Sequence, residues 1–180
     1  MGRITTVRFN CMENFEQTEK YVGLAVTREK YDFMRDYVEF FLAEQRELFE
    51  RRIAEHRIRD CHGDLHIEHI CLIDGIVVFD CIEFNERFRY SDTASEVAFL
   101  AMDLDFNGYT HYARAFVDSY ILSSGDQDLL KLLDFYMSYR AYVRAKVISF
   151  RLDQPGAAEA EQKQVVDTAS RYYELAFRYA

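Results

Sequence analysis

The chain has 180 residues, of which 49% are apolar and 16% aromatic, and this excludes a disordered polypeptide. Its net charge of −9 and pI near 5.1 argue against a surface that binds nucleic-acid phosphates. No run of about 18 apolar residues is present, so we expect no membrane span and no membrane partner. The four cysteines form no Cys-x-x-Cys pair and no secretory signal precedes them, so we expect reduced thiols and a cytoplasmic location.

The region before the segment 57–85 is predicted to contain one long helix. Only one proline, Pro155, and seven glycines interrupt the whole sequence, and few such breakers favour long helices. Residues 10–26 are ambiguous. Apolar side chains then recur at steps of three and four over residues 28–55, which predicts one amphipathic helix capped by Thr27.

A β-hairpin is predicted next, because β-branched runs at 70–73 and 76–79 flank the pair Asp74-Gly75, which accepts the backbone angles of a tight turn. Helical periodicity returns afterwards. It predicts four helices, over residues 92–106, 109–122, 126–152 and 157–179. We therefore expect an α+β fold that is predominantly helical, with residues 1–180 in a single domain and one small β-hairpin.

The polar groups gather on both sides of this hairpin. Residues 62–83 contain three histidines and five carboxylates. The strands of a hairpin run antiparallel, so His69 before the first strand and Asp80 after the second are expected to face each other and to share a metal ion. Asp64 is close enough in sequence to face the same space.

The segment His62-Gly63-Asp64-Leu65-His66 resembles the catalytic loop of the aminoglycoside phosphotransferase and choline-kinase group, whose fold is kinase-like. The resemblance continues through residues 79–85 and 92–100, where it is closest to a bacterial branch that often carries a P-loop ATPase domain. It covers roughly residues 60–105. It implies the C-terminal lobe of the kinase-like fold, with the catalytic loop and metal site within residues 60–85.

The resemblance also implies roles. Asp64 would be the base that orients and deprotonates the hydroxyl of a small-molecule acceptor, and ATP or another nucleoside triphosphate would bind with magnesium. Asp80 would be the metal aspartate, with Glu83 as an accessory ligand. His69 stands where the family has an asparagine, and because imidazole favours transition metals, manganese or zinc becomes possible.

Three further residues match positions that support the loop in the family. His62 corresponds to a histidine that holds the catalytic loop in shape. Asp92 and Glu96 match two acidic positions on the following helix, and one of them is expected to accept hydrogen bonds from the loop backbone. The acidic pair Asp103 and Asp105 is predicted to be a solvated rim.

The family also uses an N-terminal nucleotide-binding lobe, which we predict to be absent. The residues before His62 contain only Gly2 and Gly23, with no Gly-rich loop and no Val-Ala-x-Lys strand. A natural remnant, the product of a split gene and a piece of a longer protein remain open explanations. We expect the isolated chain to be inactive, and to pair with such a lobe or with a second copy of itself.

Two other functions remain open. His62, His66 and His69 at i, i+4 and i+7 can form the site of a transition-metal hydrolase, although the pattern His-Glu-x-x-His is missing. A catalytically silent interaction module is the other, because a lobe without its partner exposes apolar surface.

Overall fold

The computed structural model describes residues 2–156 and 158–180. It confirms the predominantly helical α+β class. The helices are α1 Ile4–Thr18, α2 Arg28–Glu44, α3 Arg46–Ala54, α4 Glu86–Arg89, α5 Thr93–Phe106, α6 Thr110–Ser124, α7 Leu130–Ser149 and α8 Glu159–Tyr179. Short 3-10 segments accompany them, η1 Glu19–Tyr21, η2 Ile67–His69, η3 Gln127–Leu129 and η4 Phe150–Asp153. The strands β1 Ile58–Asp60 and β4 Tyr90–Asp92 form one antiparallel pair, and β2 Ile70–Leu72 and β3 Ile76–Val78 form another.

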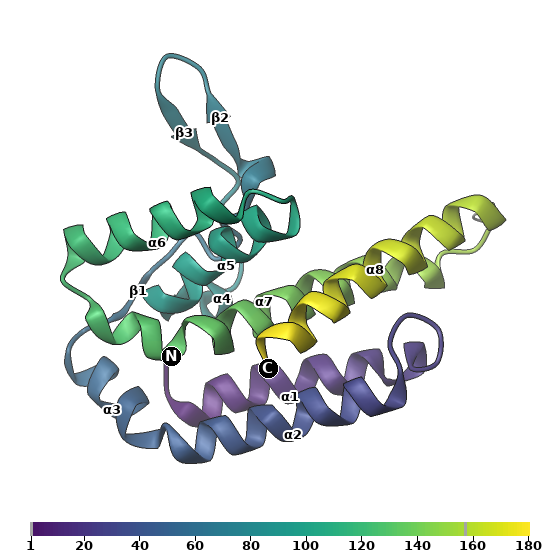
Figure 1. Cartoon of the computed structure of the whole chain (residues 1–180), viewed down its shortest axis with the longest axis horizontal. Coiled ribbons are helices and arrows are strands. Elements are labelled where there is room, and N and C mark those ends of the chain that lie inside the picture. The colour runs from purple at the N-terminus through teal and green to yellow at the C-terminus, as the bar shows by residue number, and fades with distance from the viewer. Residues whose placement is uncertain (1, 157) are drawn as a thin grey trace.

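Helix α7 lies at the centre of the helical body, where it packs most extensively against α8 and α5 (Figure 1). Its side chains are buried on several faces, from Leu132 and Phe135 to Ala145, because neighbouring helices cover it on more than one side. The contact with α8 is made close by small residues, since Ala141 and Ala145 of α7 and Ala169 of α8 are fully buried. This central helix also carries Arg140, which binds the loop of the candidate site.

Helices α1 and α2 form a second layer beside α7 (Figure 1). Tyr142 of α7 shares a hydrogen bond of 2.7 Å with Thr18 at the end of α1. Tyr31 of α2 donates a hydrogen bond to the Phe15 carbonyl of α1, and the two rings meet edge to face. Much of α1 lies in the region that the sequence left ambiguous, because its apolar side chains follow no strong helical stripe.

The helix predicted over residues 28–55 is two helices, so this prediction was wrong in one respect. Gln45 leaves the helical conformation, with φ −98° and ψ 15°, and separates α2 from α3. Buried residues continue at helical spacing across the break, from Leu42 to Phe49, so periodicity alone does not reveal it. The break matters because α3 then carries Arg52 into the core.

The other predicted helices are confirmed within a few residues. Helix α5 begins one residue after the predicted start, and α6 ends at Gly125, whose φ of 67° closes the helix. Helix α7 follows the 3-10 turn η3, and α8 begins at Glu159; Ala157, where it was predicted to begin, lies outside the described residues. Within residues 2–156 and 158–180, none of the helices combines the length and the apolar character needed to cross a bilayer.

The predicted hairpin is present and stands away from the helical body (Figure 1). Ile70 pairs with Val78 and Leu72 with Ile76, and the turn between them places Asp74 and Gly75 at positive φ, as the Asp-Gly pair predicted. The pairing of β1 with β4 was not predicted, because each strand has three residues and 29 residues of chain lie between them. It sets the two ends of the segment that contains the loop and the hairpin beside each other.

Candidate functional site

The loop that follows β1 is held by side chains from two helices. The Gly63 N–H donates to the carboxylate of Glu96 in α5, at 3.1 and 3.3 Å, and the Gly63 carbonyl accepts from Arg140 Nη1 of α7, at 3.1 Å. Gly63 has a φ of +83°, and a side chain there would meet Ile82 and the Phe88 carbonyl at about 3.2 Å. One of Asp92 and Glu96 was expected to accept hydrogen bonds from the loop backbone, and Glu96 does so.

His62 uses both of its ring nitrogens to hold the loop. Its Nδ1 accepts from the Asp64 N–H at 3.3 Å, and its Nε2 lies 2.7 Å from the Phe79 carbonyl. Because a carbonyl only accepts hydrogen bonds, Nε2 carries the proton and Nδ1 has the lone pair. The His62 carbonyl also accepts from the Ile82 N–H. His62 therefore ties the loop to the chain that leaves the hairpin, which is the supporting role expected of it.

His66 and His69 lie at the two ends of the 3-10 turn η2, with ring centroids 4.0 Å apart. Residues i and i+3 eclipse in a 3-10 turn, which explains this proximity. His66 Nε2 lies 3.5 Å from Asp64 Oδ2. One potential ligand atom from each of Asp64, His66 and His69 falls within 4.8 Å of the others. Sequence reasoning gave His66 only an alternative role, yet the structure includes it in the group.

The predicted metal residues His69 and Asp80 do meet at the base of the hairpin. His69 Nε2 is 3.4 Å from Asp80 Oδ2, and the Phe79 N–H donates to the His69 carbonyl. Asp80 has a backbone φ of 62°, which is unusual for a residue other than glycine, and its side chain is 75% exposed. The antiparallel geometry of the hairpin thus places the two residues as expected.

The carboxyl of Asp64 lies between these groups and the solvent. Partial burial raises its pKa, but the hydrogen bond to His66 and the charges of His66, His69 and Arg144 lower it more, so the pKa lies below its ordinary value. The carboxylate is therefore ionised at neutral pH, and it is available to accept a proton or to bind a cation.

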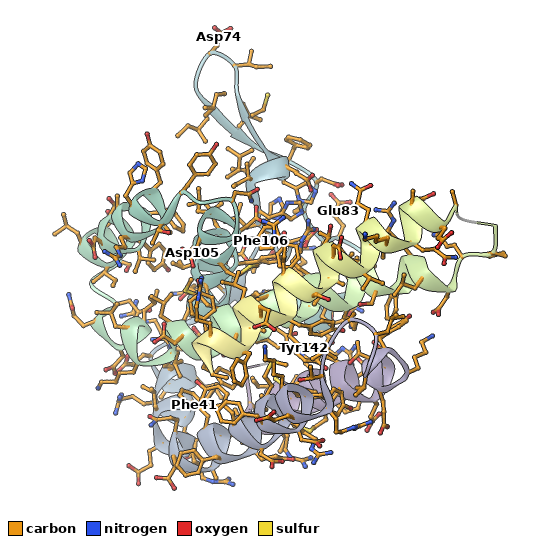
Figure 2. The ribbon with its side chains drawn as sticks, turned by 45° about the vertical axis from the view of Figure 1, so that its right-hand side comes forward. Phe41, Asp74, Glu83, Asp105, Phe106 and Tyr142 are labelled. Carbon is orange, nitrogen blue, oxygen red and sulfur yellow. The ribbon has the colours of Figure 1, made fainter. Side chains whose placement is uncertain are left out.

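Glu83, expected as an accessory ligand, is exposed and lies outside the group whose ligand atoms converge. Figure 2 shows it at the surface, well away from the hairpin tip marked by Asp74. Glu83 was expected near Asp80 because the two are three residues apart in sequence. The chain between them is an irregular loop, so this closeness in sequence did not bring Glu83 into the group.

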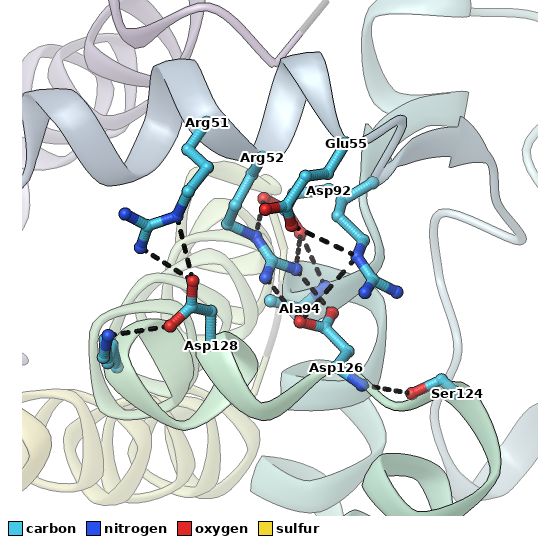
Figure 3. A network of polar contacts seen from close by, with 10 residues as sticks. Arg51, Arg52, Glu55, Asp92, Ala94, Ser124, Asp126 and Asp128 are labelled. Carbon is cyan, nitrogen blue, oxygen red and sulfur yellow. Dashed lines mark hydrogen bonds and ion pairs between the residues drawn. The ribbon is translucent and has the colours of Figure 1, made fainter.

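The carboxylate of Asp92 belongs to a buried network of ion pairs and hydrogen bonds (Figure 3). It caps α5 by accepting from the Ala94 N–H at 2.8 Å, and both of its oxygens accept from the guanidinium of Arg52 at 2.7 Å. The same guanidinium donates to Asp126 at 2.8 Å. All three charged side chains are buried, so α3, the start of α5 and the residue before η3 meet at one ion cluster.

Two residues at the site were missed by sequence reasoning. Asp103, predicted to be a solvated rim, is buried, and its Oδ2 accepts from the Ile67 N–H at 2.9 Å. Asp92, Glu96 and Asp103 follow each other at steps of four and seven residues, which places them on one face of α5. This spacing could have predicted that Asp103 faces the loop. Arg140 gave no such signal, because it is one of two arginines on a helix buried on more than one side.

The chain is similar to uncharacterised proteins of Mycobacterium tuberculosis and Mycobacterium bovis. Each is 35% identical over 171 residues, which make up 93% of this chain and 34% of the relative. The chain thus spans about a third of the length of these curated relatives. No family model matches the chain, and no solved structure matches it.

Proposed function

We propose that this chain is the catalytic-loop lobe of a kinase-like phosphotransferase of the aminoglycoside-phosphotransferase kind. It would transfer the γ-phosphate of a nucleoside triphosphate to a hydroxyl of a small molecule. The observation that carries the proposal is the place of His69 between two carboxylates, with Nδ1 3.7 Å from Asp64 Oδ2 and Nε2 3.4 Å from Asp80 Oδ2. Phosphoryl transfer requires a base and a metal-binding carboxylate in one site.

In this proposal Asp64 is the base. Its carboxylate is ionised and partly open to solvent, and its backbone is held by His62 on one side and through Gly63 by Glu96 on the other. A held carboxylate can orient the acceptor hydroxyl and take its proton as the hydroxyl attacks phosphorus.

Asp80 and His69 would hold the metal ion that accompanies the nucleotide. The carboxylate oxygens of Asp80 and Asp64 fit magnesium, while the imidazole of His69 fits manganese or zinc better. When bound, such an ion neutralises charge on the nucleotide phosphates. The 75% exposure of the Asp80 side chain leaves it accessible to a nucleotide from solvent.

The hairpin and the loop after it support the proposal that a second lobe completes the site. Leu72 and Ile76 of the hairpin are 78% and 76% exposed, and Phe84 of the following loop is 87% exposed. An isolated hairpin with bare apolar side chains is marginally stable in water. A second copy of the chain is the alternative cover. The curated relatives are about three times as long as the matched region, so they contain chain enough for another lobe.

Calorimetric titration of ATP with magnesium or manganese tests this proposal on the chain as it is. We expect metal-dependent binding that weakens about tenfold or more in Asp80→Asn. Asp74→Asn is the matched control, since Asp74 is also an exposed aspartate at positive φ, 52° against 62°. Binding unchanged in Asp80→Asn, or metal-independent, would contradict the proposal. Silence with every nucleotide would favour the interaction module.

The hydrolase alternative loses one of its ligands in this structure. It requires His62, His66 and His69, but both ring nitrogens of His62 are engaged in holding the loop. The two remaining histidines still lie beside Asp64.

A further inference from the structure

His66 is a buried histidine whose polar atoms are poorly satisfied. Only 3% of the residue is exposed, and within the described residues its Nδ1 has no hydrogen-bond partner. Buried polar groups without partners are rare in native proteins, and each calls for an explanation such as a bound ion. Its Nε2 points toward Asp64, at 3.5 Å from Oδ2, and its Nδ1 points toward Glu68, at 3.6 Å from Oε2.

This orientation is compatible with a metal ligand. A histidine that binds a metal through one nitrogen usually donates its other N–H to a carboxylate or a carbonyl. Glu68 stands on the Nδ1 side of His66 at 3.6 Å, within a small side-chain movement of a hydrogen bond. Such a bond would leave His66 Nε2, on the side of Asp64, to bind an ion.

His69 has the same arrangement. Its Nδ1 is 2.8 Å from the Asp64 carbonyl, which can only accept, so Nδ1 donates to it, and the same nitrogen is 3.7 Å from Asp64 Oδ2. Nε2 lies on the side of Asp80, at 3.4 Å from Oδ2. In both histidines, therefore, Nδ1 faces an oxygen acceptor and Nε2 is the nitrogen left to bind an ion.

The backbone that carries these side chains is held before any ion binds. The Ile67 N–H is bound to Asp103, the Gly63 N–H to Glu96, and the Asp64 N–H to His62. A site on a held scaffold loses little conformational entropy when it binds a ligand. The exposed side chain of Asp80 leaves one side open for an ion to enter.

We propose that Asp64, His66 and His69 bind one divalent transition-metal ion in the absence of nucleotide, with the fourth position open to solvent. Two imidazoles and one carboxylate suit zinc, cobalt or manganese, whereas magnesium and calcium select oxygen ligands. This binding does not rest on the proposed phosphotransfer. If that function also holds, an ion on Asp64 occupies the base, so zinc inhibits transfer that magnesium supports.

Cobalt(II) and zinc titrations of the nucleotide-free chain test the site. We expect one equivalent of cobalt to give the intense visible bands of a four-coordinate ion, and zinc to displace it with one-to-one stoichiometry. His69→Ala and His66→Asn are each expected to weaken binding about a hundredfold or more. His111→Ala, a change to an exposed histidine on α6, is the matched control and leaves binding unchanged.

Circular dichroism first establishes that each variant is folded. If His66→Asn does not fold, because His66 is buried, His69→Ala alone tests the site. Absence of one-to-one binding, or binding equal in His69→Ala and the wild-type chain, overturns the proposal. So does a spectrum of a fully hydrated cobalt ion. None of these results bears on ATP binding through Asp80, which the calorimetry above measures independently.

Discussion

The loop from His62 to His69 and the hairpin from Ile70 to Phe79 are consecutive in the chain, yet they relate to the helical body in opposite ways. The loop is bound by buried or half-buried polar groups of α5 and α7, including Glu96, Asp103 and Arg140. The hairpin has its own ladder, and its outer residues Leu72, Ile73 and Ile76 are more than half exposed.

The difference shows that local sequence specifies the hairpin, whereas long-range contacts specify the loop. The hairpin forms from local signals, namely β-branched runs and a turn pair, and it needs nothing from the body to define its register. The loop has no regular structure of its own, so its shape depends on hydrogen bonds to residues more than thirty positions away. We therefore expect changes in the body to disturb the loop strongly, and changes in the hairpin to disturb the body little.

The largest effect is expected from Arg52→Ala, because it removes the cation between the buried carboxylates of Asp92 and Asp126. Two buried anions would then face each other without compensation. Breaking a buried ion cluster in this way costs about 3–5 kcal/mol of unfolding free energy. Urea denaturation measures the loss.

Arg51→Ala is the control for that change. Arg51 is the neighbouring arginine, and it binds Asp128 at the surface at 2.7 Å, where solvent weakens the pair. We expect a loss of at most about 1 kcal/mol. Equal losses in the two variants would contradict the view that the buried cluster supports the base of the loop.

A smaller effect is expected from Glu96→Ala, which removes the acceptor of the Gly63 N–H. A half-buried donor left without its partner costs about 1–3 kcal/mol. Hydrogen exchange at Gly63 and its neighbours is expected to accelerate more than the change in global stability explains, because the loop opens locally. Glu50→Ala, at an exposed position of α3, should leave both measurements unchanged.

The smallest effect is expected from the double change Leu72→Thr and Ile76→Thr. These residues pair across the hairpin and are exposed, and threonine retains the preference for strands. The unfolding free energy should change by no more than about 0.5 kcal/mol. Leu132→Ala, at a fully buried position of α7, should instead cost about 2–5 kcal/mol. A large loss in the hairpin variant that depends on protein concentration would show that the hairpin is covered by a second copy.

Several features of the fold follow from local sequence alone. Periodicity placed α5, α6, α7 and α8 within a few residues, and the hairpin followed from Asp74-Gly75 between β-branched runs. The break at Gln45 was missed because the buried positions keep their helical spacing across it. The β1–β4 pair was missed because three-residue strands carry too little alternation to be recognised.

The candidate site divides in the same way. Antiparallel pairing alone predicted that His69 and Asp80 would meet, and they do at 3.4 Å. Sequence could not rank the histidines, because the role of a histidine depends on which of its ring nitrogens is already engaged. His62 is saturated by the loop and by Phe79, whereas His66 keeps a nitrogen without a partner.

The sequence by itself thus determined the helical class, the hairpin and the segment in which the polar groups gather, because these depend on spacing and on turn residues. Only the tertiary structure decided that Asp103 is buried under the loop, that Arg52 links two aspartates, and that Glu83 remains at the surface. The physical reason is that a polar side chain takes its partner from whatever backbone or charge the packing brings near, and packing joins residues that sequence keeps far apart.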